Sequence, residues 1–335
     1  MFNVAVVGAT GAVGTVMLRV LEERGFPVTR LLPLASERSA GRQLDYLGKP
    51  CRVERLTEDS FEGVDIALFS AGASRSRAYA PSAVEAGAVV IDNSSAYRMD
   101  PGVPLVVPEV NEDAIEGHSG IIANPNCVAA PLVCVLKPIA DAVGLERVIL
   151  SSYQSVSGTG AAAVAELREQ TRGFLADDEP EPAVYPHEIA FNVLPHIGVF
   201  GEDGYSDEER KVAEETRKMM RLPNLAVSAT CVRVPVFYGH SESVQIETTD
   251  HISAEAARNL LMAAPGLVVV DEPALNRYPL ARDAAGHDEV YVGRIREDSS
   301  HPRGLALWIV SDNLRKGAAT NAVQIAESLV TNGWM

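Results

Sequence analysis

Short apolar runs alternate with helical patterns over residues 1–127. An apolar run at 2–7 stops at Gly8, and apolar positions spaced three and four apart then continue to Gly25. The same alternation follows in apolar runs at 28–34, 64–69 and 88–91, with a helical stretch at 76–86. Strands that alternate with helices at these lengths predict a parallel, doubly wound sheet.

Longer strands dominate after residue 127. Runs rich in β-branched residues lie at 147–156, 226–236, 243–249, 290–295 and 305–310. Such strands in succession predict a mixed or antiparallel sheet in an α+β domain. A last helical pattern lies at 314–330. We therefore expect an α/β chain of two domains, the first over 1–127 and completed by a C-terminal helix within 314–335, the second over 128–313.

Charge and cysteine content narrow the classes of function. A formal net charge of −16 argues against a nucleic-acid partner, which would favour a basic surface. No apolar stretch reaches the length of a membrane span, and no basic segment precedes the first apolar run. The four cysteines are unpatterned, and neither they nor the seven histidines have zinc-ligand spacing. We expect a cytoplasmic protein with reduced thiols and with no metal, membrane or nucleic-acid partner.

The loop from Gly8 to Gly14 carries glycines at Gly8, Gly11 and Gly14, between the first strand and the first helix. This spacing is a variant of the dinucleotide-binding fingerprint, in which glycines permit a tight turn and close approach of the backbone to a pyrophosphate. A glycine-rich structural turn is the alternative. The position of the loop favours dinucleotide binding.

The end of the second strand bears on the choice between NAD and NADP. An acidic residue there holds the ribose 2′-hydroxyl of NAD, whereas a cation accommodates the 2′-phosphate of NADP. The chain supplies hydroxyls and a cation in Ser36, Arg38 and Ser39. Glu37 could take the NAD role if its side chain points inward. We expect NADP.

Cys127 follows a short apolar run and the sequence Asn-Pro-Asn, and precedes a long run rich in Ala, Val and Leu. The pattern predicts a strand, a tight turn and a helix, with the thiol near the helix N-terminus. Backbone N–H groups and the helix dipole at such a position lower the pKa of a thiol. The alternative is an inert buried cysteine, since free cysteine is among the most buried residue types.

Three polar residues lie at or near the ends of the long strands. Gln154 ends one strand, where its amide could bind a carboxylate or a developing oxyanion. Arg233 alternates with valines and so needs an acidic partner; its guanidinium suits a carboxylate. His240, beside Gly239 and between two strands, has a pKa suited to proton transfer. The alternatives are a satisfied polar group, a structural ion pair and an exposed loop histidine.

Two further positions carry charges that suit an anionic ligand. Arg98 lies just past a predicted strand end, where open α/β sheets bind anions. Glu208 and Lys211 lie three apart in a helix that begins near Asp207, so both side chains could reach one ligand. The same spacing recurs at residues 215 and 218, and ordinary solvent-exposed pairs are the alternative.

Taken in order, these motifs resemble the aspartate-β-semialdehyde dehydrogenase family along essentially the whole chain. The resemblance is carried by 8–14, Asn124-Pro125-Asn126-Cys127, Gln154 with Ser157-Gly158, Glu208 with Lys211, Arg233 with His240, and 312–319. It implies a Rossmann-type NADP domain and an α+β catalytic and dimerisation domain with a mixed sheet. It also implies a homodimer or a dimer of dimers that acts on a small-molecule substrate.

The resemblance implies reversible reductive dephosphorylation of L-aspartyl-4-phosphate with NADPH, towards lysine, threonine, methionine and isoleucine. It makes Cys127 the nucleophile that forms an acyl-thioester, His240 the acid/base catalyst and Gln154 an orienting group. Arg233 would bind the substrate carboxylate, Glu208 its ammonium group, and Arg98 with Lys211 the phosphate. The cofactor would be lined by Thr10, Gly11, Ala12, Val13, Arg38, Ser39, Ser157, Gly158 and Asn313.

Two other functions are compatible with the same architecture. An N-acetyl-γ-glutamyl-phosphate reductase shares the Cys–His chemistry, but its acetylated substrate would not need a carboxylate such as Glu208. A non-catalytic NADP-binding paralogue would be expected to lose the nucleophile, whereas this chain keeps Cys127, Gln154, Arg233 and His240.

Overall fold

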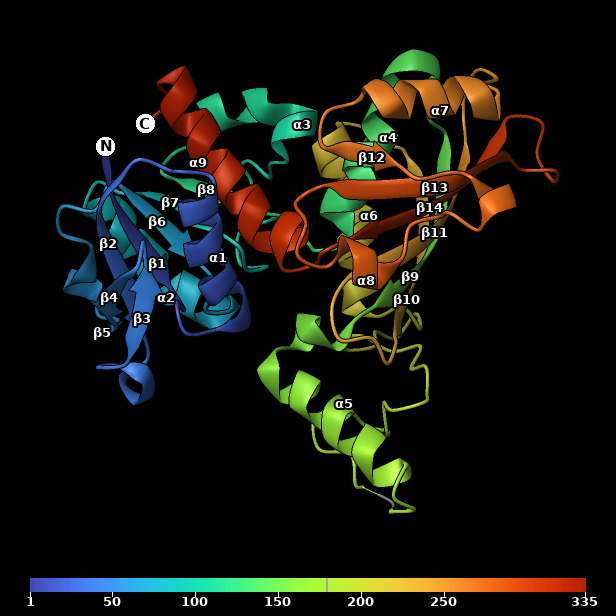
Figure 1. The fold of residues 1–335 in the computed structure, drawn as a ribbon. Helices are drawn as coiled ribbons and strands as arrows, with labels where there is room; N and C mark the ends of the chain where they lie inside the picture. The colour runs from blue at the N-terminus through green and yellow to red at the C-terminus, as the bar shows by residue number, and fades with distance from the viewer. Residues whose placement is uncertain (179) are drawn as a thin grey trace. The chain divides into compact units, whose positions relative to one another are not determined.

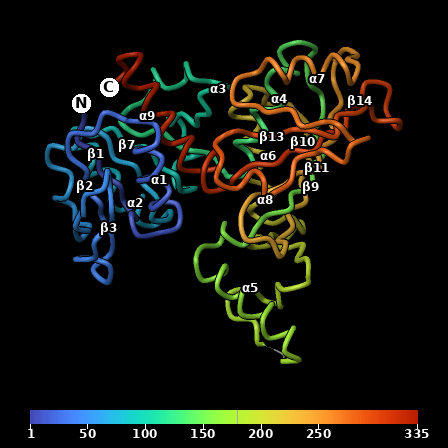
Figure 2. Tube along the Cα trace, viewed as in Figure 1, coloured from blue at the N-terminus to red at the C-terminus, as the bar shows by residue number. Residues whose placement is uncertain are grey.

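The computed structural model describes residues 1–178 and 180–335. The chain divides into two compact units. Unit 1 comprises Met1–Asn126 and Ala318–Met335, and unit 2 comprises Cys127–Gly317. The trace starts and ends in unit 1, so the N-terminal and C-terminal segments belong to the same unit (Figure 2).

Unit 1 is built on a six-stranded parallel sheet with the order β5-β2-β1-β6-β7-β8 (Figure 1). Its strands are β1 (Phe2–Val7), β2 (Val28–Ala35), β5 (Glu54–Arg55), β6 (Ile66–Phe69), β7 (Val89–Asp92) and β8 (Ile121–Ala123). The chain moves outward from β1 to β2 and then crosses to β6 on the other side. The carboxyl ends of β1 and β6 therefore flank the switch point at which open α/β sheets bind ligands.

Helices cover both faces of this sheet, because successive residues along its strands point to opposite faces and each face has its own apolar core. Val4 and Val6 belong to a core shared with α1 (Ala12–Glu23) and α9 (Thr320–Asn332). Ala5 and Val7 belong to a core shared with α2 (Ala73–Glu85). The smaller elements are β3 (Gln43–Tyr46), β4 (Lys49–Arg52), α3 (Pro108–Asn111), and the 3₁₀ turns η1 (Glu37–Ser39), η2 (Glu58–Phe61) and η3 (Glu112–Gly117). The predicted doubly wound sheet is confirmed.

Unit 2 is built on a six-stranded mixed sheet with the order β10-β9-β11-β14-β13-β12. Its strands are β9 (Arg147–Gln154), β10 (Ala226–Arg233), β11 (His240–Glu247), β12 (Leu267–Val269), β13 (Val290–Glu297) and β14 (Gly304–Ser311). Strand β11 runs antiparallel to both β9 and β14, whereas β9 and β10 are parallel. The predicted mixed sheet is confirmed.

The helical elements of unit 2 are α4 (Ala129–Val143), α5 (Ala161–Phe174), α6 (Asp207–Met220), α7 (Ala254–Ala263) and α8 (Ala281–Ala284), with short turns η4 (Val156–Thr159) and η5 (Pro273–Leu275) and a π-helix η6 (Arg315–Ala319) that runs into unit 1. Along β9, residues Val148 to Gln154 alternate between buried and half-buried. The buried positions face α6, which contacts β10, while the half-buried positions form a more open second face.

Some element boundaries differ from the sequence-based expectation. Strand β11 begins at His240, three residues earlier than expected, because the polar residues His240, Ser241 and Glu242 are buried strand positions that hide the apolar signal. The two strands expected at 147–156 and 226–236 end at Gln154 and Arg233. The last helix begins as the π-helix η6 and becomes α-helical at Thr320.

Candidate active site

One edge of the unit 2 sheet gathers the predicted catalytic side chains. Gln154 pairs with Arg233 where β9 and β10 end, and His240 pairs with Ser311 where β11 begins and β14 ends. Because β11 is antiparallel to β9, the start of one strand lies beside the end of the other. The sheet topology thus brings Gln154, Arg233 and His240 together, although they are far apart in sequence.

Cys127 lies in a turn two residues before α4, and its Sγ is 3.4 Å from Nε2 of His240. The thiol residue is half-buried, whereas His240 is 1 % exposed. Burial lowers the pKa of His240 well below its usual value, and the positive charge of Arg233 lowers it further. The imidazole is therefore uncharged at neutral pH. The proximity that covalent and acid–base catalysis require is present between these two groups.

Two glycines bring the backbone close to this pair. A Cβ built at Gly158 would lie 3.2 Å from Nη1 of Arg233 and 3.4 Å from the ring of His240. A Cβ built at Gly317, in η6, would lie 3.0 Å from the Cβ of Cys127. A larger residue at either position would press on the candidate catalytic groups.

Gln154 connects the sheet edge to α6. Its Nε2 donates to Oε1 of Glu208 over 3.1 Å, and its Oε1 accepts from the hydroxyl of Ser152 over 2.9 Å. Helix α6 begins at a capping box formed by Ser206 and Glu209, which fixes the first turn that presents Glu208. Gln154 and Glu208 are therefore held side by side.

Lys211 lies on the same helix, where its Nζ pairs with Oδ2 of Asp207 at 2.6 Å. The sequence reasoning placed Lys211 with Glu208 and did not identify Asp207 as its partner. A spacing of four residues brings Asp207 and Lys211 to one helix face. Burial would raise the pKa of Asp207, but the hydrogen bonds from Lys211 and from the backbone N–H of Val199, together with the charge of Lys211, lower it.

Arg233 is 5 % exposed and has no acidic partner among the described residues, so the structural ion pair considered from sequence is not formed. Its Nη1 donates to the backbone oxygen of Ser155 over 2.7 Å, while its Nε has no hydrogen-bond partner. It alternates with the half-buried Val232 as expected, whereas Val234 lies beyond the end of β10 and is itself buried. A buried cation with an unused donor is suited to an anionic group such as a carboxylate.

Asn313 follows β14 and joins three segments of the site. Its Oδ1 accepts from the backbone N–H of Gly239 over 3.1 Å and from the hydroxyl of Ser155 over 3.0 Å. Its Nδ2 donates to Oγ of Ser157 over 3.0 Å. Asn313, Ser155 and Ser157 are each at most 2 % exposed. Of the expected cofactor residues, Ser157, Gly158 and Asn313 therefore lie close to His240.

Two glycines of the unit 1 loop lie where a side chain would not fit. Gly8 has a positive φ of 87°, and a Cβ there would lie 2.4 Å from the backbone oxygen of Ser70. A Cβ at Gly14 would lie 2.2 Å from the oxygen of Gly8. Residues 10–13 are half-buried or exposed, and Gly11 gives α1 no side-chain cap. The first backbone N–H groups of α1 thus fit the pyrophosphate of a dinucleotide.

The turn after β2 presents the residues expected to discriminate between the two dinucleotides. Ser36, Glu37 and Arg38 are exposed, and Ser39 is buried at the end of η1. The Glu37 side chain is 78 % exposed and lies 3.6 Å from Arg55. An ion pair this exposed holds the Glu37 carboxylate only weakly. The turn therefore exposes both the negative charge of Glu37 and the positive charge of Arg38 to a ligand.

Arg98 lies past β7 in unit 1 and is 8 % exposed. Its Nε donates to the backbone oxygen of Asn124, and its Nη2 donates to that of Asn93, each over 2.9 Å. These bonds hold the guanidinium at the carboxyl end of the parallel sheet, the end at which open α/β sheets bind ligands.

Sequence reasoning missed three residues that border the site. Ser155 contacts Nδ1 of His240, Gly317 packs on Cys127, and Glu242 lies two residues after His240 on the same face of β11. Glu242 is 1 % exposed, and burial raises the pKa of its carboxyl well above its usual value. Ser155 directly follows Gln154 and Gly317 lies in the motif after Asn313, so closeness to predicted site residues was the available signal.

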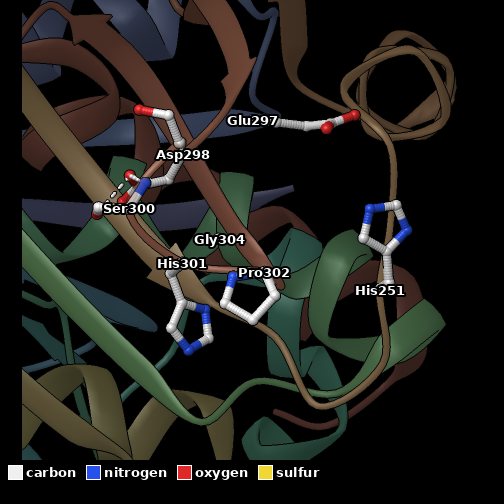
Figure 3. Close-up of a pocket in the computed structure, with 8 residues that line it drawn as sticks. His251, Glu297, Asp298, Ser300, His301, Pro302 and Gly304 are labelled. Carbon is white, nitrogen blue, oxygen red and sulfur yellow. Dashed lines mark hydrogen bonds between the residues drawn. The ribbon is translucent and has the colours of Figure 1, made fainter.

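A polar cavity of about 530 Å³ lies at the other end of the same strands (Figure 3). It is lined by His251 and by the loop between β13 and β14, including Asp298, Ser300 and His301. Since β14 runs from Gly304 beside this cavity to Ser311 opposite His240, the length of the strand separates the two. Within 1–178 and 180–335, no cluster of His, Cys, Asp or Glu suits a metal ion, and no helix is long and apolar enough to cross a membrane.

Comparison with known proteins identifies both units. Residues 3–118 match the family described as semialdehyde dehydrogenase, NAD binding domain, and residues 136–316 match semialdehyde dehydrogenase, dimerisation domain. An aspartate-semialdehyde dehydrogenase of Aquifex aeolicus is 56 % identical over 99 % of each chain. Together with the fold, these matches define the class as the two-domain semialdehyde dehydrogenases with an NAD(P)-binding Rossmann domain.

Solved structures agree with this class. The structure of aspartate semialdehyde dehydrogenase II from Vibrio cholerae complexed with ASA has a TM-score of 0.96 and 50 % identity, and covers 99 % of this chain and 98 % of that one. The enzyme from Candida albicans with NADP has a TM-score of 0.78 and 26 % identity, and the match covers both chains fully. The chain therefore belongs to the aspartate-semialdehyde dehydrogenase family and is an oxidoreductase of that activity. The family resemblance inferred from the motifs is confirmed.

Proposed function

We propose that the protein converts L-aspartyl-4-phosphate reversibly to aspartate semialdehyde and phosphate, with NADPH and through a thioester on Cys127. The observation that carries the proposal is the 3.4 Å approach of Cys127 Sγ to His240 Nε2 at the sheet edge that also holds Gln154 and Arg233. The reaction supplies the branch point towards lysine, threonine, methionine and isoleucine.

In the reductive direction, the sulfur of Cys127 attacks the acyl phosphate, the thioester C–S bond forms, and phosphate leaves. A covalent intermediate divides one difficult substitution into two easier steps. His240 exchanges a proton with the oxygen of the reacting carbonyl, a role typically worth about 10²–10⁴-fold in rate. Gln154 lies beside this pair and orients the substrate through its side-chain amide.

Charges around the nucleophile fit a substrate with two anionic groups and one cationic group. Arg233, with its unused Nε, binds the α-carboxylate. Glu208, held by Gln154, binds the α-ammonium group. Arg98 and Lys211 bind the phosphate. A free ammonium group explains the carboxylate of Glu208, which an N-acetylated substrate would not need.

Candidate cofactor residues are found in each of the two units, considered separately. When bound, NADP(H) supplies or removes the hydride. The Gly8–Gly14 loop with the start of α1 would hold its pyrophosphate, and Ser36, Arg38 and Ser39 its 2′-phosphate. Ser157, Gly158 and Asn313 would contact it beside His240. The NADP named with the Candida albicans structure supports this choice over NAD.

The open face of the unit 2 sheet supports a homodimer, or a dimer of dimers. Ile149, Ser151 and Tyr153 point to this half-buried face, with Trp308 opposite Ser243 on the neighbouring pair of strands. A half-exposed sheet face with aromatic and aliphatic side chains is suited to a second copy. The dimerisation domain matched over residues 136–316 supports the same assembly. We place the enzyme in the cytoplasm, as expected for a chain whose cysteines form no disulfide within residues 1–178 and 180–335.

The test is phosphate-dependent reduction of NADP by aspartate semialdehyde, run beside N-acetylglutamate semialdehyde and with Cys127→Ala. Turnover of aspartate semialdehyde alone, lost in the variant, is expected. Turnover of the N-acetylated aldehyde instead would assign the reductase function. No turnover of either would favour the non-catalytic paralogue, and full activity in the variant would exclude the thioester.

A further inference from the structure

Ser155 offers two groups to the same nitrogen of His240. Its backbone N–H donates to Nδ1 over 3.0 Å, and its hydroxyl lies 3.1 Å from Nδ1. An amide N–H can only donate, so this bond requires a lone pair on Nδ1 and leaves the proton of a neutral ring on Nε2. A hydroxyl oxygen can also accept, so it can pair with Nδ1 when that nitrogen carries a proton.

Asn313 determines the direction of the Ser155 hydroxyl. The backbone N–H of Gly239 donates to Oδ1 of Asn313 over 3.1 Å, which fixes the orientation of the side-chain amide. The Ser155 hydroxyl donates to the same Oδ1 over 3.0 Å. With its proton engaged there, the oxygen of Ser155 turns its lone pairs towards Nδ1 of His240.

We propose that Ser155 is a positioning residue for His240, which Asn313 holds so that Nδ1 is paired whether or not it carries a proton. The inference rests on the acid–base role proposed for His240. In the resting neutral ring the proton is on Nε2. Nε2 can take a proton from the hydroxyl of the thiohemiacetal only after the ring has lost its Nε2 proton to water and gained one from water at Nδ1. The Ser155 oxygen accepts the Nδ1–H bond in that tautomer and in the doubly protonated ring that forms when Nε2 gains the proton.

The groups around the imidazole explain why this acceptor matters. Burial and the charge of Arg233 both disfavour the protonated ring. The acidic groups nearby do not offset this, because Glu242 is itself buried with a raised pKa. Charged or titratable residues on the elements packed around the ring include Cys127, Glu208, Glu209, Arg233, Glu242 and Asp312, which directly follows β14. A hydrogen bond to a charged group is worth more than one to a neutral group.

Two variants should change the titration of His240 in opposite directions. Ser155→Ala removes the acceptor and should lower the pKa of His240, with kcat reduced about 10–100-fold and the KM for aspartate semialdehyde unchanged. Asn313→Asp keeps the acceptor for Gly239 and Ser155 but adds a negative charge, and should raise that pKa by about one unit. Thr159→Val removes a hydroxyl that bonds to Tyr185 in the same turn, and serves as the control.

The readouts are ¹⁵N NMR of labelled histidines in the protein without substrate or cofactor, assigned with His240→Gln, and the pH profile of kcat at saturating NADP. Wild type should show an unprotonated Nδ1 at neutral pH, and the acid limb should shift upward only in Asn313→Asp. The inference would be overturned if the pKa of His240 shifted in the same direction in both variants, or if both variants titrated as Thr159→Val does. A protonated Nδ1 in the neutral ring of the wild-type protein without substrate would also overturn it. A wild-type protein that turns over no aspartate semialdehyde would instead refute the proposed function, while the NMR result would still stand.

Discussion

Replacing Gly317 with alanine should displace the nucleophile without unfolding the protein. Gly317 lies in η6, and a Cβ there would be 3.0 Å from the Cβ, 3.1 Å from the carbonyl oxygen and 3.2 Å from the Cα of Cys127. Ordinary contacts begin near 3.4 Å, so the two segments must separate by a few tenths of an ångström. The φ of Gly317 is not positive, so alanine is compatible with its backbone.

The magnitude follows from two opposing effects. Alanine stabilises a helical position by about 0.5–1 kcal/mol relative to glycine, whereas overpacking costs about 1–3 kcal/mol. The free energy of unfolding should therefore decrease by no more than about 2.5 kcal/mol. Misplacement of a reacting group by about 1 Å costs about 10²-fold, so a shift of a few tenths should reduce kcat about 3–10-fold.

The assay compares kcat with aspartate semialdehyde, the rate of Cys127 alkylation by iodoacetamide, and the melting temperature. Gly117→Ala is the matched control, because Gly117 has nothing within 4 Å of a built Cβ and no positive φ. If Gly317→Ala kept the kcat and the alkylation rate of the wild-type protein, the predicted displacement of Cys127 would be refuted. If Gly117→Ala lost as much kcat as Gly317→Ala, the effect would not be local to Cys127.

Three further substitutions test separate parts of the structure. Arg38→Ala should raise the KM for NADP about 10-fold or more and leave that for NAD nearly unchanged; equal effects would assign the discrimination to Glu37. Glu242→Gln should gain stability over wild type as pH rises above about 4.5, by up to about 1.4 kcal/mol per pH unit, because the raised pKa of this carboxyl makes ionisation costly only when folded. A difference in melting temperature between Glu242→Gln and wild type that is the same at every pH would contradict this expectation. Ile149→Asp should yield a monomer by analytical ultracentrifugation while Met262→Asp, on exposed α7, stays dimeric; an unchanged mass for Ile149→Asp would place the interface elsewhere.

The helices and strands with a clear hydrophobic periodicity could be predicted from the sequence. Those whose existence or bounds depend on tertiary contacts could not. Strand β1 was predicted to the residue because its apolar run ends at a glycine with a positive φ. Helix α7 and the β3–β4 hairpin were not predicted, since their amphipathic signals are short. The start of β11 was misplaced because buried polar residues at 240–242 interrupt the apolar pattern.

Motif order singled out Cys127, Gln154, Arg233 and His240, which the structure brings together, but it did not predict how they interact. Alternation placed Arg233 on the face opposite its neighbouring valines, yet its partner is a backbone oxygen and not a carboxylate. Spacing predicted that Glu208 and Lys211 could reach one ligand, but it did not predict that Lys211 bonds to Asp207 or that Glu208 bonds to Gln154. Partners between distant strands depend on register, which a single sequence does not specify.

Covalent catalysis by Cys127 is tested most directly by intact-protein mass spectrometry. Protein mixed with aspartate semialdehyde and NADP, without phosphate, should gain the mass of one aspartyl acyl group. Peptide mapping should place the group on Cys127, and added phosphate should remove it. Cys127→Ala should gain no mass. Turnover without any adduct, or an adduct on another residue that phosphate releases at the rate of turnover, would contradict a thioester on Cys127.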